Sequence, residues 1–229
     1  MRLLSSLCAI TLAISLLSCA GTKVKPDAQS AFQQGMVLFD RGKYAEALPH
    51  FEKALALDPE FSKAHLYLGR SRLNQGQWLE AIPPLRAAYR LAPEESKKEA
   101  MGILLDAILG AAVSELKKGD FSQSVGLFKE ALKLDPASGE VKGQLAGALM
   151  NWGGDLLAKG DWAGAATAYG EAADMAPHNL QALMGLAQAF FKGGDFKKAL
   201  ESAQKALKID PSYFEALSLL LKIGMGAGK

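Results

Sequence analysis

The chain has very little cysteine. Its 229 residues contain only Cys8 and Cys19, both close to the N-terminus. The rest of the chain therefore has no thiol for a disulfide, a thiolate metal site or a cysteine nucleophile. A domain without thiols suits an oxidising compartment outside the cytoplasm.

Histidine is equally scarce, and the motifs of common enzyme classes do not occur. His50, His65 and His178 are scattered along the chain. The sequence has no H-E-x-x-H zinc motif, no phosphate-binding loop and no G-x-S-x-G nucleophile motif. We therefore expect a protein that is not an enzyme and that binds no metal and no cofactor.

Neither sign of charge dominates, and no long apolar run follows residue 18. The 26 Lys and Arg residues nearly balance the 24 Asp and Glu residues, which gives a net charge of +2. A near-neutral chain lacks the basic footprint of a nucleic-acid-binding protein. The segment 101–113 is apolar, but Asp106 interrupts it, which favours a buried helix over a membrane span. We expect no contact with nucleic acid and no membrane contact by the folded domain.

The N-terminus has the organisation of a secretory signal peptide. Met1 and Arg2 form a short basic start, and residues 3–17 are mostly apolar. This run is shorter than the roughly 20 residues that a membrane-spanning helix needs. Its length fits the hydrophobic region of a signal peptide, which we expect to cover residues 1–18.

The end of this segment, Leu16-Leu17-Ser18-Cys19, resembles the bacterial lipobox. The resemblance implies cleavage before Cys19, lipidation of Cys19 and a lipidated tether at 19–27. Ala20, and not an aspartate, follows the cysteine. By resemblance to enterobacterial sorting, this implies the outer membrane, with the protein facing the periplasm. The alternative is an ordinary signal peptide cut after Ala20, with Ser18 and Ala20 as the small residues.

One spacing pattern occurs five times in the rest of the chain. Each copy ends in a proline. Counted back from this proline, an alanine stands five residues before it, a second small residue twelve before it, an aromatic residue fifteen before it and a glycine seventeen before it. Five copies indicate a repeat array, which buries its core by stacking units and typically presents an extended binding surface. The prolines are Pro59, Pro93, Pro136, Pro177 and Pro211, and the glycines are Gly42, Gly76, Gly119, Gly160 and Gly194. The alanines are Ala54, Ala88, Ala131, Ala172 and Ala206, and the second small residues are Ala47, Ala81, Ser124, Ala165 and Ala199.

Each copy is predicted to be a pair of antiparallel helices. The first helix ends at the glycine, which can adopt the left-handed conformation that stops a helix. The second helix ends before the proline, which cannot continue it. The small residues allow the helix backbones to approach closely, and apolar residues such as Leu48, Phe51 and Leu55 recur at helical spacing. The predicted fold class is therefore all-α.

These residues resemble the tetratricopeptide repeat, a 34-residue helix–turn–helix with the signature W-x2-L-G-x2-Y, A-x3-F and P. The resemblance covers nearly all of the chain after residue 27. It implies a right-handed superhelical solenoid of helix pairs with a C-terminal capping helix. We place the domain at 28–229, with repeats at 28–61, 62–95, 105–138, 146–179 and 180–213 and a cap at 214–225.

The array is irregular in its middle. Successive prolines are 34, 43, 41 and 34 residues apart, so extra residues precede the third and fourth repeats, around 96–104 and 139–145. We predict that the first helices of these repeats begin about two turns early, because the seven extra residues before the fourth repeat are close to two turns and so keep the helix face. Long loops are the alternative. Gly139, Gly143 and Gly147 share one helix face, which fits either close packing against repeat three or docking of a partner backbone.

The resemblance also implies a concave groove lined by the first helix of each repeat. Its lining is apolar with scattered polar positions, which suits an amphipathic helix or an extended apolar segment of a protein partner. The Lys/Asn/Arg clamp with which some family members bind C-terminal carboxylates does not occur. The alternative is that several of these residues pack against the neighbouring helix. The predicted groove residues are Phe32, Met36, Phe39, Leu66, Arg70, Leu73, Val113, Leu116, Met150, Gly154, Leu157, Met184, Gln188 and Phe191.

Repeat four offers small residues where other repeats have larger groove side chains. Gly147, Gly154 and Ala158 predict a depression there, with Met150 and Leu157 as its floor. An apolar recess of this kind would bind the main anchor of a partner segment. The predicted walls are Val113, Leu116, Met184 and Phe191.

Together these features favour a lipid-anchored interaction scaffold of the bacterial envelope. By resemblance, such repeat lipoproteins serve pilus or secretion machinery, outer-membrane assembly or polysaccharide export. Their shared mechanism would be an anchored solenoid that binds a partner segment and guides its assembly or localisation. The alternative is a soluble periplasmic tetratricopeptide adaptor that regulates a cell-wall enzyme.

Overall fold

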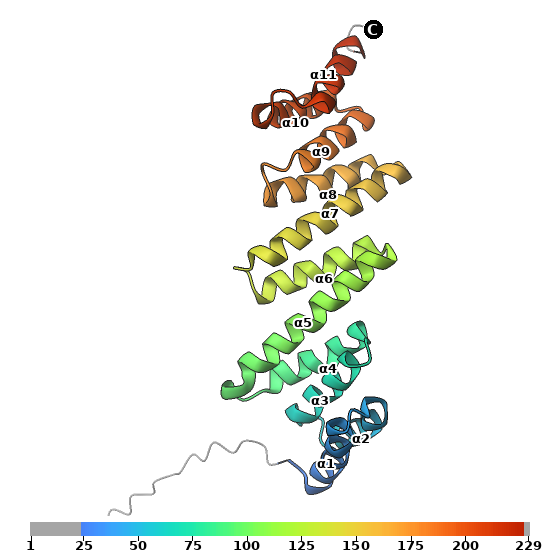
Figure 1. The fold of residues 1–229 in the computed structure, drawn as a ribbon, viewed down its shortest axis with the longest axis vertical. Helices are drawn as coiled ribbons and strands as arrows, with labels where there is room; N and C mark the ends of the chain where they lie inside the picture. The colour runs from blue at the N-terminus through green and yellow to red at the C-terminus, as the bar shows by residue number, and fades with distance from the viewer. Residues whose placement is uncertain (1–23, 227–229) are drawn as a thin grey trace, which may run out of the picture.

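The computed structural model describes residues 24–226, and over this range the chain forms eleven α-helices and no strand (Figure 1). The expected signal peptide and Cys19 lie outside the described residues. None of these eleven helices is long and apolar enough to cross a membrane. The helices are α1 (Pro26–Asp40), α2 (Tyr44–Leu57), α3 (Ser62–Leu73), α4 (Trp78–Leu91), α5 (Glu94–Lys118), α6 (Phe121–Leu134), α7 (Gly139–Lys159), α8 (Trp162–Met175), α9 (Leu180–Lys192), α10 (Phe196–Ile209) and α11 (Phe214–Gly226).

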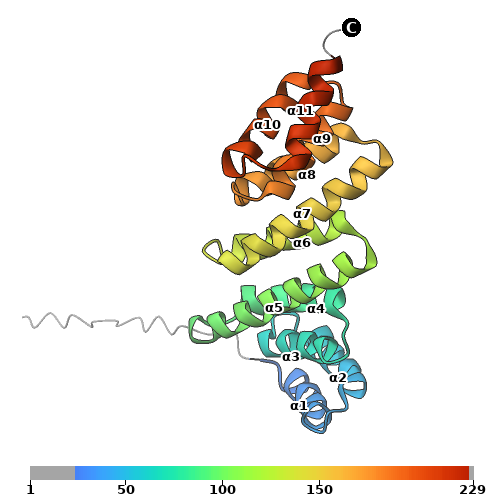
Figure 2. The same cartoon turned by 45° about the horizontal axis from the view of Figure 1, so that its top comes forward.

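The helices stack in chain order into an elongated solenoid. Each helix packs mainly against the helix before it and the helix after it. Figures 1 and 2 show α1 at one end of the stack and α11 at the other. The terminal α11 packs on α10 and more lightly on α9. The predicted all-α solenoid of helix pairs, ended by one further helix, is confirmed.

The turns between paired helices depend on glycine. Gly119 and Gly160 follow α5 and α7 directly and adopt φ angles of +82° and +80°, in the left-handed region that residues with a side chain rarely adopt. The other three pattern glycines also have positive φ. The second helix of each pair ends two residues before the pattern proline. Both predicted stop signals are therefore confirmed.

The small residues of the pattern lie where helices touch. All ten of them have no exposed surface. Ser124 is the only polar residue among them, and its hydroxyl donates a hydrogen bond of 2.8 Å to the Ala112 carbonyl. Within the first pair, a Cβ added to Gly35 would lie 2.6 Å from the Phe51 ring. The backbones thus approach too closely for larger side chains at these positions.

The insertions before repeats three and four are helical. The first helices of these repeats, α5 and α7, are 25 and 21 residues long, against 12 to 15 for α1, α3 and α9. The predicted early start of both helices is confirmed, and the loop alternative is wrong. The two long helices are conspicuous in the middle of Figure 2.

The glycine stripe of α7 packs against nothing. A Cβ added at Gly139, Gly143 or Gly147 would meet no atom within 4 Å outside the helix's own backbone. Close packing against repeat three is therefore the wrong explanation for these glycines. The stripe lies open along the extended first half of α7.

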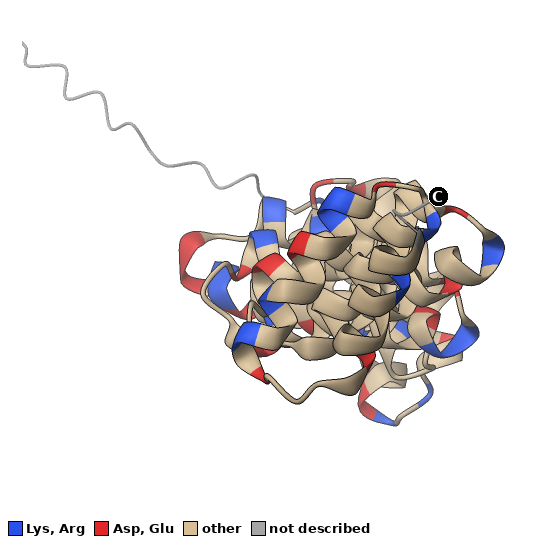
Figure 3. Cartoon of the chain, turned by 90° about the horizontal axis from the view of Figure 1, so that it is seen from above, with Lys and Arg blue, Asp and Glu red and all other residues tan. Residues whose placement is uncertain are grey.

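Charged residues of both signs alternate over the surface (Figure 3). Ion pairs join the second helices of successive repeats, since Arg86 of α4 pairs with Glu130 of α6, and Lys129 of α6 pairs with Glu171 of α8. Exposed pairs of this kind contribute little to stability. The described surface offers no extended face of one sign in this view.

Candidate functional site

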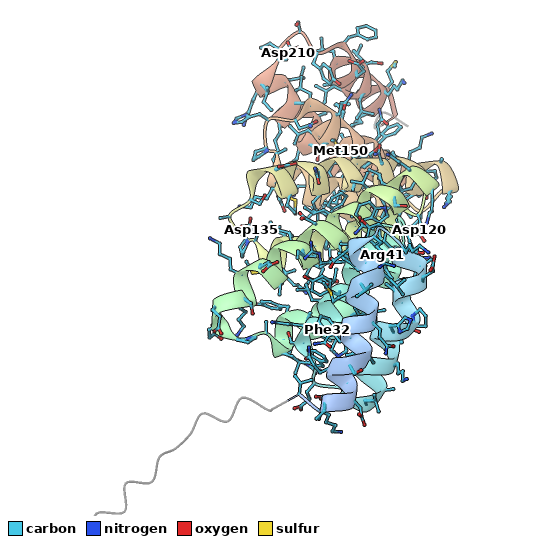
Figure 4. The ribbon with its side chains drawn as sticks, turned by 60° about the horizontal axis from the view of Figure 1, so that its bottom comes forward. Phe32, Arg41, Asp120, Asp135, Met150 and Asp210 are labelled. Atoms are coloured by element: carbon cyan, nitrogen blue, oxygen red, sulfur yellow. The ribbon has the colours of Figure 1, made fainter. Side chains whose placement is uncertain are left out.

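The predicted groove residues of the first two repeats form an aromatic cluster. Phe32 is only 7% exposed, and its ring lies 4.9 Å from that of Phe61. The Phe39 ring stands edge-on to that of Tyr67 at 5.1 Å. The Arg70 guanidinium lies 5.2 Å from the Tyr67 ring centre, within range of a cation–π interaction. Phe32, labelled on α1 in Figure 4, belongs to the core and presents little surface to a partner.

In the middle of the array, the predicted groove residues also support the core. Val113, Leu116 and Met150 are partly buried and pack against the core cluster that runs from repeat three to α11. Leu66 and Leu73 pack against the neighbouring cluster centred on α4 and α5, and Met36 packs against the cluster of the first repeat. These residues fit the alternative that groove positions pack against neighbouring helices.

A recess of about 570 Å³ lies at the C-terminal end of the solenoid, between α7, α9 and α11. Four predicted groove residues line it: Leu157, Met184, Gln188 and Phe191. Met184 and Leu219 are almost fully buried and form its apolar floor. The other lining residues are Ala158, Trp162, Lys192, Phe214, Glu215, Ser218, Leu219 and Lys222.

This recess lies one repeat further along the chain than the sequence predicted. Gly154 does not line it, and neither do Met150, Val113 and Leu116. A Cβ added to Gly154 would meet the Tyr169 hydroxyl of α8 at an ordinary contact distance of 3.5 Å. Of the residues predicted for the depression, Leu157, Ala158, Met184 and Phe191 line the recess, whereas Gly154 does not.

The Tyr169 ring also accounts for the presence of glycine at Gly153 and Gly185. A Cβ added to Gly153 of α7 or to Gly185 of α9 would lie 2.8 or 2.2 Å from the Tyr169 ring. The ring therefore occupies the space that both glycines leave between the helices. Burial raises the pKa of the Tyr169 hydroxyl above its ordinary value.

The rim of the recess is charged, whereas its floor is apolar. Lys192, Glu215 and Lys222 are exposed at the rim. Gln188 is also exposed and offers an amide that can donate and accept hydrogen bonds. An apolar floor with a few polar groups at its edge is the usual composition of a site that desolvates one apolar side chain and orients its neighbours.

The sequence did not indicate the contribution of α11. Phe214, Glu215, Ser218 and Lys222 form one side of the recess, and none of them was a predicted groove residue. A signal was available, because α11 has the length and register of the first helix of a further repeat. Extending the groove positions by one unit would have included this helix.

The architecture is that of a helical repeat solenoid, in which stacked helix pairs present an extended surface. The tetratricopeptide repeat model matches residues 32–96 and 150–214, more than half of the chain. The chain belongs to the tetratricopeptide repeat family. Proteins of this family are typically non-enzymatic scaffolds for protein–protein interaction.

The chain is similar to several solved structures of tetratricopeptide repeat proteins. A tetratricopeptide repeat protein of Bacteroides fragilis NCTC 9343 is 16% identical, with a TM-score of 0.57, and the match covers 88% of this chain and 99% of that one. YrrB, described as having an unusual peptide-binding site, is 20% identical, with a TM-score of 0.35 and coverage of 84% and 91%. The first repeat domain of Spaghetti (RPAP3), bound to an HSP90 peptide, is 17% identical, with a TM-score of 0.39 and coverage of 55% and 94%. Curated proteins give no significant sequence match.

Proposed function

We propose that the protein is an outer-membrane lipoprotein that faces the periplasm and binds a partner protein segment in the recess between α7, α9 and α11. The recess itself carries this proposal. It is the described surface where an apolar floor, a charged rim and three converging helices coincide. The bound segment would belong to an envelope complex, of the pilus, secretion, outer-membrane or polysaccharide-export kind, whose assembly or localisation the scaffold assists.

The chemistry of the recess defines the segment that it fits. An aliphatic or aromatic side chain would be desolvated on the floor formed by Met184 and Leu219, and this is the most favourable single contribution available there. Lys192 and Lys222 at the rim favour an acidic residue beside this anchor. The best-fitting partner is thus a segment with one large apolar residue flanked by a carboxylate.

The lipid anchor and the recess would lie at opposite ends of the molecule. The lipobox residues support lipidation of Cys19, and α1 begins at Pro26. The intervening segment spans at most ~25 Å, at about 3.5 Å per residue. The first repeat would therefore stay near the membrane, while the stack carries the recess away from it (Figure 1).

Site-specific photo-crosslinking tests the recess. A photoreactive residue at Gln188, within the full-length protein in its native membranes, should capture an envelope protein. The same residue at the exposed Gln33 of α1 should not capture that protein. Ala158→Phe, which fills the recess from α7, should abolish the capture, whereas Ala56→Phe on the exposed face of α2 should not. Equal capture from Gln188 and Gln33, or capture unaffected by Ala158→Phe, would place the partner elsewhere.

The anchor needs a separate test. Mass spectrometry of the mature protein should find a lipid-modified N-terminus at Cys19, and Cys19→Ala should leave the protein soluble or unprocessed. An unmodified N-terminus at Gly21 would contradict lipidation. That result favours the second candidate, a soluble periplasmic adaptor that regulates a cell-wall enzyme, because the alternative cut after Ala20 leaves no lipidated cysteine.

A further inference from the structure

The outer side of α11 carries a row of exposed apolar side chains. Phe214, Leu217, Leu221 and Met225 are 75%, 42%, 67% and 70% exposed, and together we call them the α11 stripe. They lie opposite Ala216, Leu219 and Ile223, which bury the inner side of the helix. No element within residues 24–226 covers the stripe. Four large apolar side chains in one row on a single helix favour an interface.

The α11 stripe is not shaped to receive the second helix of an ordinary repeat. At the eighth position of every complete repeat stands a glycine or alanine. In repeats one, two and four, a large side chain of the second helix lies against this glycine. The eighth residue from the start of α11 is Leu221. A leucine here prevents the close approach that the other five positions allow, so a different occupant is required.

The stripe is complementary to itself in the antiparallel direction. When two α11 helices face each other with a two-fold axis between Leu217 and Leu221, each Leu217 meets the Leu221 of the other copy. Phe214 then meets Gly224, where a Cβ would find nothing within 4 Å and a large ring has room. Both ends of the row are thereby filled by the same pairing. A surface that pairs with itself in this way is what an isologous two-fold dimer requires.

The charges beside the stripe match the same register. Glu215 and Lys222 lie along one edge of α11, seven residues apart and therefore on the same side of the helix. In the antiparallel pairing, the Glu215 of each copy lies alongside the Lys222 of the other. In a parallel pairing this edge would face the opposite edge of the other copy, so Glu215 and Lys222 would not meet each other. Charge complementarity thus selects the antiparallel arrangement.

We infer that the α11 stripe is a homodimer interface, in which two copies of the chain pair through antiparallel α11 helices about a two-fold axis. Phe214, Glu215 and Ser218 belong to both α11 and the recess. The dimer therefore holds two recesses close to its axis. A partner with two suitable segments, or a partner that is itself dimeric, would bind such a pair with greater avidity than a single recess.

Sedimentation equilibrium of the full-length protein in density-matched detergent tests the dimer. The wild type should have the mass of two chains, each of 24.3 kDa before any processing. Leu221→Glu should raise the dissociation constant about tenfold or more, because it buries two unpaired carboxylates at the axis. The matched control is Val37→Glu, which places the same charge on an exposed apolar residue of α1. A single-chain mass for the wild type, or a dimer that tolerates Leu221→Glu, overturns the inference.

Charge exchange tests the antiparallel register. Glu215→Lys and Lys222→Glu should each raise the dissociation constant about two- to fivefold, as expected for exposed ion pairs replaced by like charges. An equal mixture of the two variants should form a heterodimer with wild-type affinity, since both cross-pairs are then restored. A mixture that associates no better than the separate variants contradicts the register.

Cysteine crosslinking separates a second copy from an unrelated helix. Ser218→Cys lies near the proposed axis, so a short bismaleimide added to cells should link two copies of the chain. The parent protein, which has no cysteine among the described residues, controls for Cys8 and Cys19. A product of twice the chain mass supports the homodimer. Absence of the product of twice the chain mass overturns the inference, whereas a product with a different protein reports on the recess, which Ser218 also lines.

Discussion

Ala131 and Ala172 show how much depends on single small side chains in this fold. Both are fully buried on second helices, at the place where adjacent helices come closest. Replacing either with leucine forces several additional carbon atoms into a packed contact. We predict that Ala131→Leu and Ala172→Leu each lower the free energy of unfolding by about 1–3 kcal/mol, measured by chemical denaturation.

The control for this prediction is Ala56→Leu, on the exposed face of α2. This change should alter the free energy of unfolding by less than about 0.5 kcal/mol. Equal stability of all three variants and the parent would show that the buried alanines do not set the helix spacing.

The carboxyl of Asp195 caps the N-terminus of α10 and makes part of the stability of the fold depend on pH. Its carboxylate accepts a hydrogen bond of 3.1 Å from the Lys198 amide and lies 3.0 Å from the Lys198 ammonium. These two contacts hold the pKa of Asp195 below its ordinary value. A carboxyl with a lowered pKa stabilises the fold above its unfolded pKa of about 4, and this contribution is lost as the pH falls through the folded value.

We therefore predict that Asp195→Asn makes the folding stability of the protein less dependent on pH in the acidic range. Asparagine keeps the cap hydrogen bond to the Lys198 amide but cannot titrate. The Tm of the parent should fall more between pH 7 and pH 3 than that of Asp195→Asn, as measured by circular dichroism. Asp174→Asn, at an exposed position that caps no helix, should retain the full dependence of the parent. An identical fall for Asp195→Asn and the parent would contradict the role of the cap.

The positions of turns and close contacts could be predicted from the sequence, because the same spacing recurs five times. Gly119 and Ser124 illustrate this, since one has the expected positive φ and the other the expected burial. The environment of the α7 glycines could not be predicted in this way. Spacing shows which residues share a helix face, but it does not show what lies opposite that face.

At the level of helices, α7 combines two kinds of glycine. Gly143 is exposed, and a Cβ there would meet nothing within 4 Å. Gly153 lies against the Tyr169 ring, with 2.8 Å from its Cβ position to the nearest ring atom. We predict that Gly143→Ala raises the free energy of unfolding by up to about 1 kcal/mol, because alanine favours the helix more than glycine does.

Gly153→Ala provides the opposite test on the same helix. The gain in helix propensity is the same, but the methyl group displaces the Tyr169 ring, so this variant should be less stable than the parent. Denaturant unfolding of both variants measures the difference. If Gly153→Ala is as stable as Gly143→Ala, the two helices are not in the close contact that the structure shows.

The length of α7 followed from the sequence because its seven-residue insertion is close to two whole turns. An extension of that kind keeps the buried face in register, so α7 buries Val141 and Leu145 in its extension on the same face as Leu149 in the repeat. The packing of α11 was less predictable. The sequence predicted α11 as a capping helix, but the exposure of Leu221 depends on how the neighbouring helices pack against α11.

Over the full length of the array, the position of the recess depends on how repeats are set against each other. Sequence spacing fixes contacts inside one helix pair, whereas the recess needs α7, α9 and α11 to converge from three pairs. The Tyr169 ring fills the space that Gly153 and Gly185 leave between α7 and α9. The sequence thus predicted Leu157, Ala158, Met184, Gln188 and Phe191 as lining residues but not the contribution of α11.

Stability should also vary along the stack, because contacts reach mainly from one helix to the next. The first repeat has its own core cluster around Phe51, which is separate from the large cluster that extends from Ala112 to Ile223. In such an array, stability is a sum over repeats and their interfaces, and one end can open while the other stays folded.

We predict that Phe51→Ala, a fully buried truncation of the kind that costs about 3–5 kcal/mol, opens the first repeat selectively. Hydrogen exchange should show loss of amide protection in α1, α2 and the start of α3, while α7 to α10 exchange as in the parent. Val37→Ala removes an exposed side chain from the same repeat and should leave all protection unchanged. If Phe51→Ala weakens protection in α9 and α10 as much as in α1, the array unfolds as one cooperative unit. The recess at the far end would then depend on the first repeat.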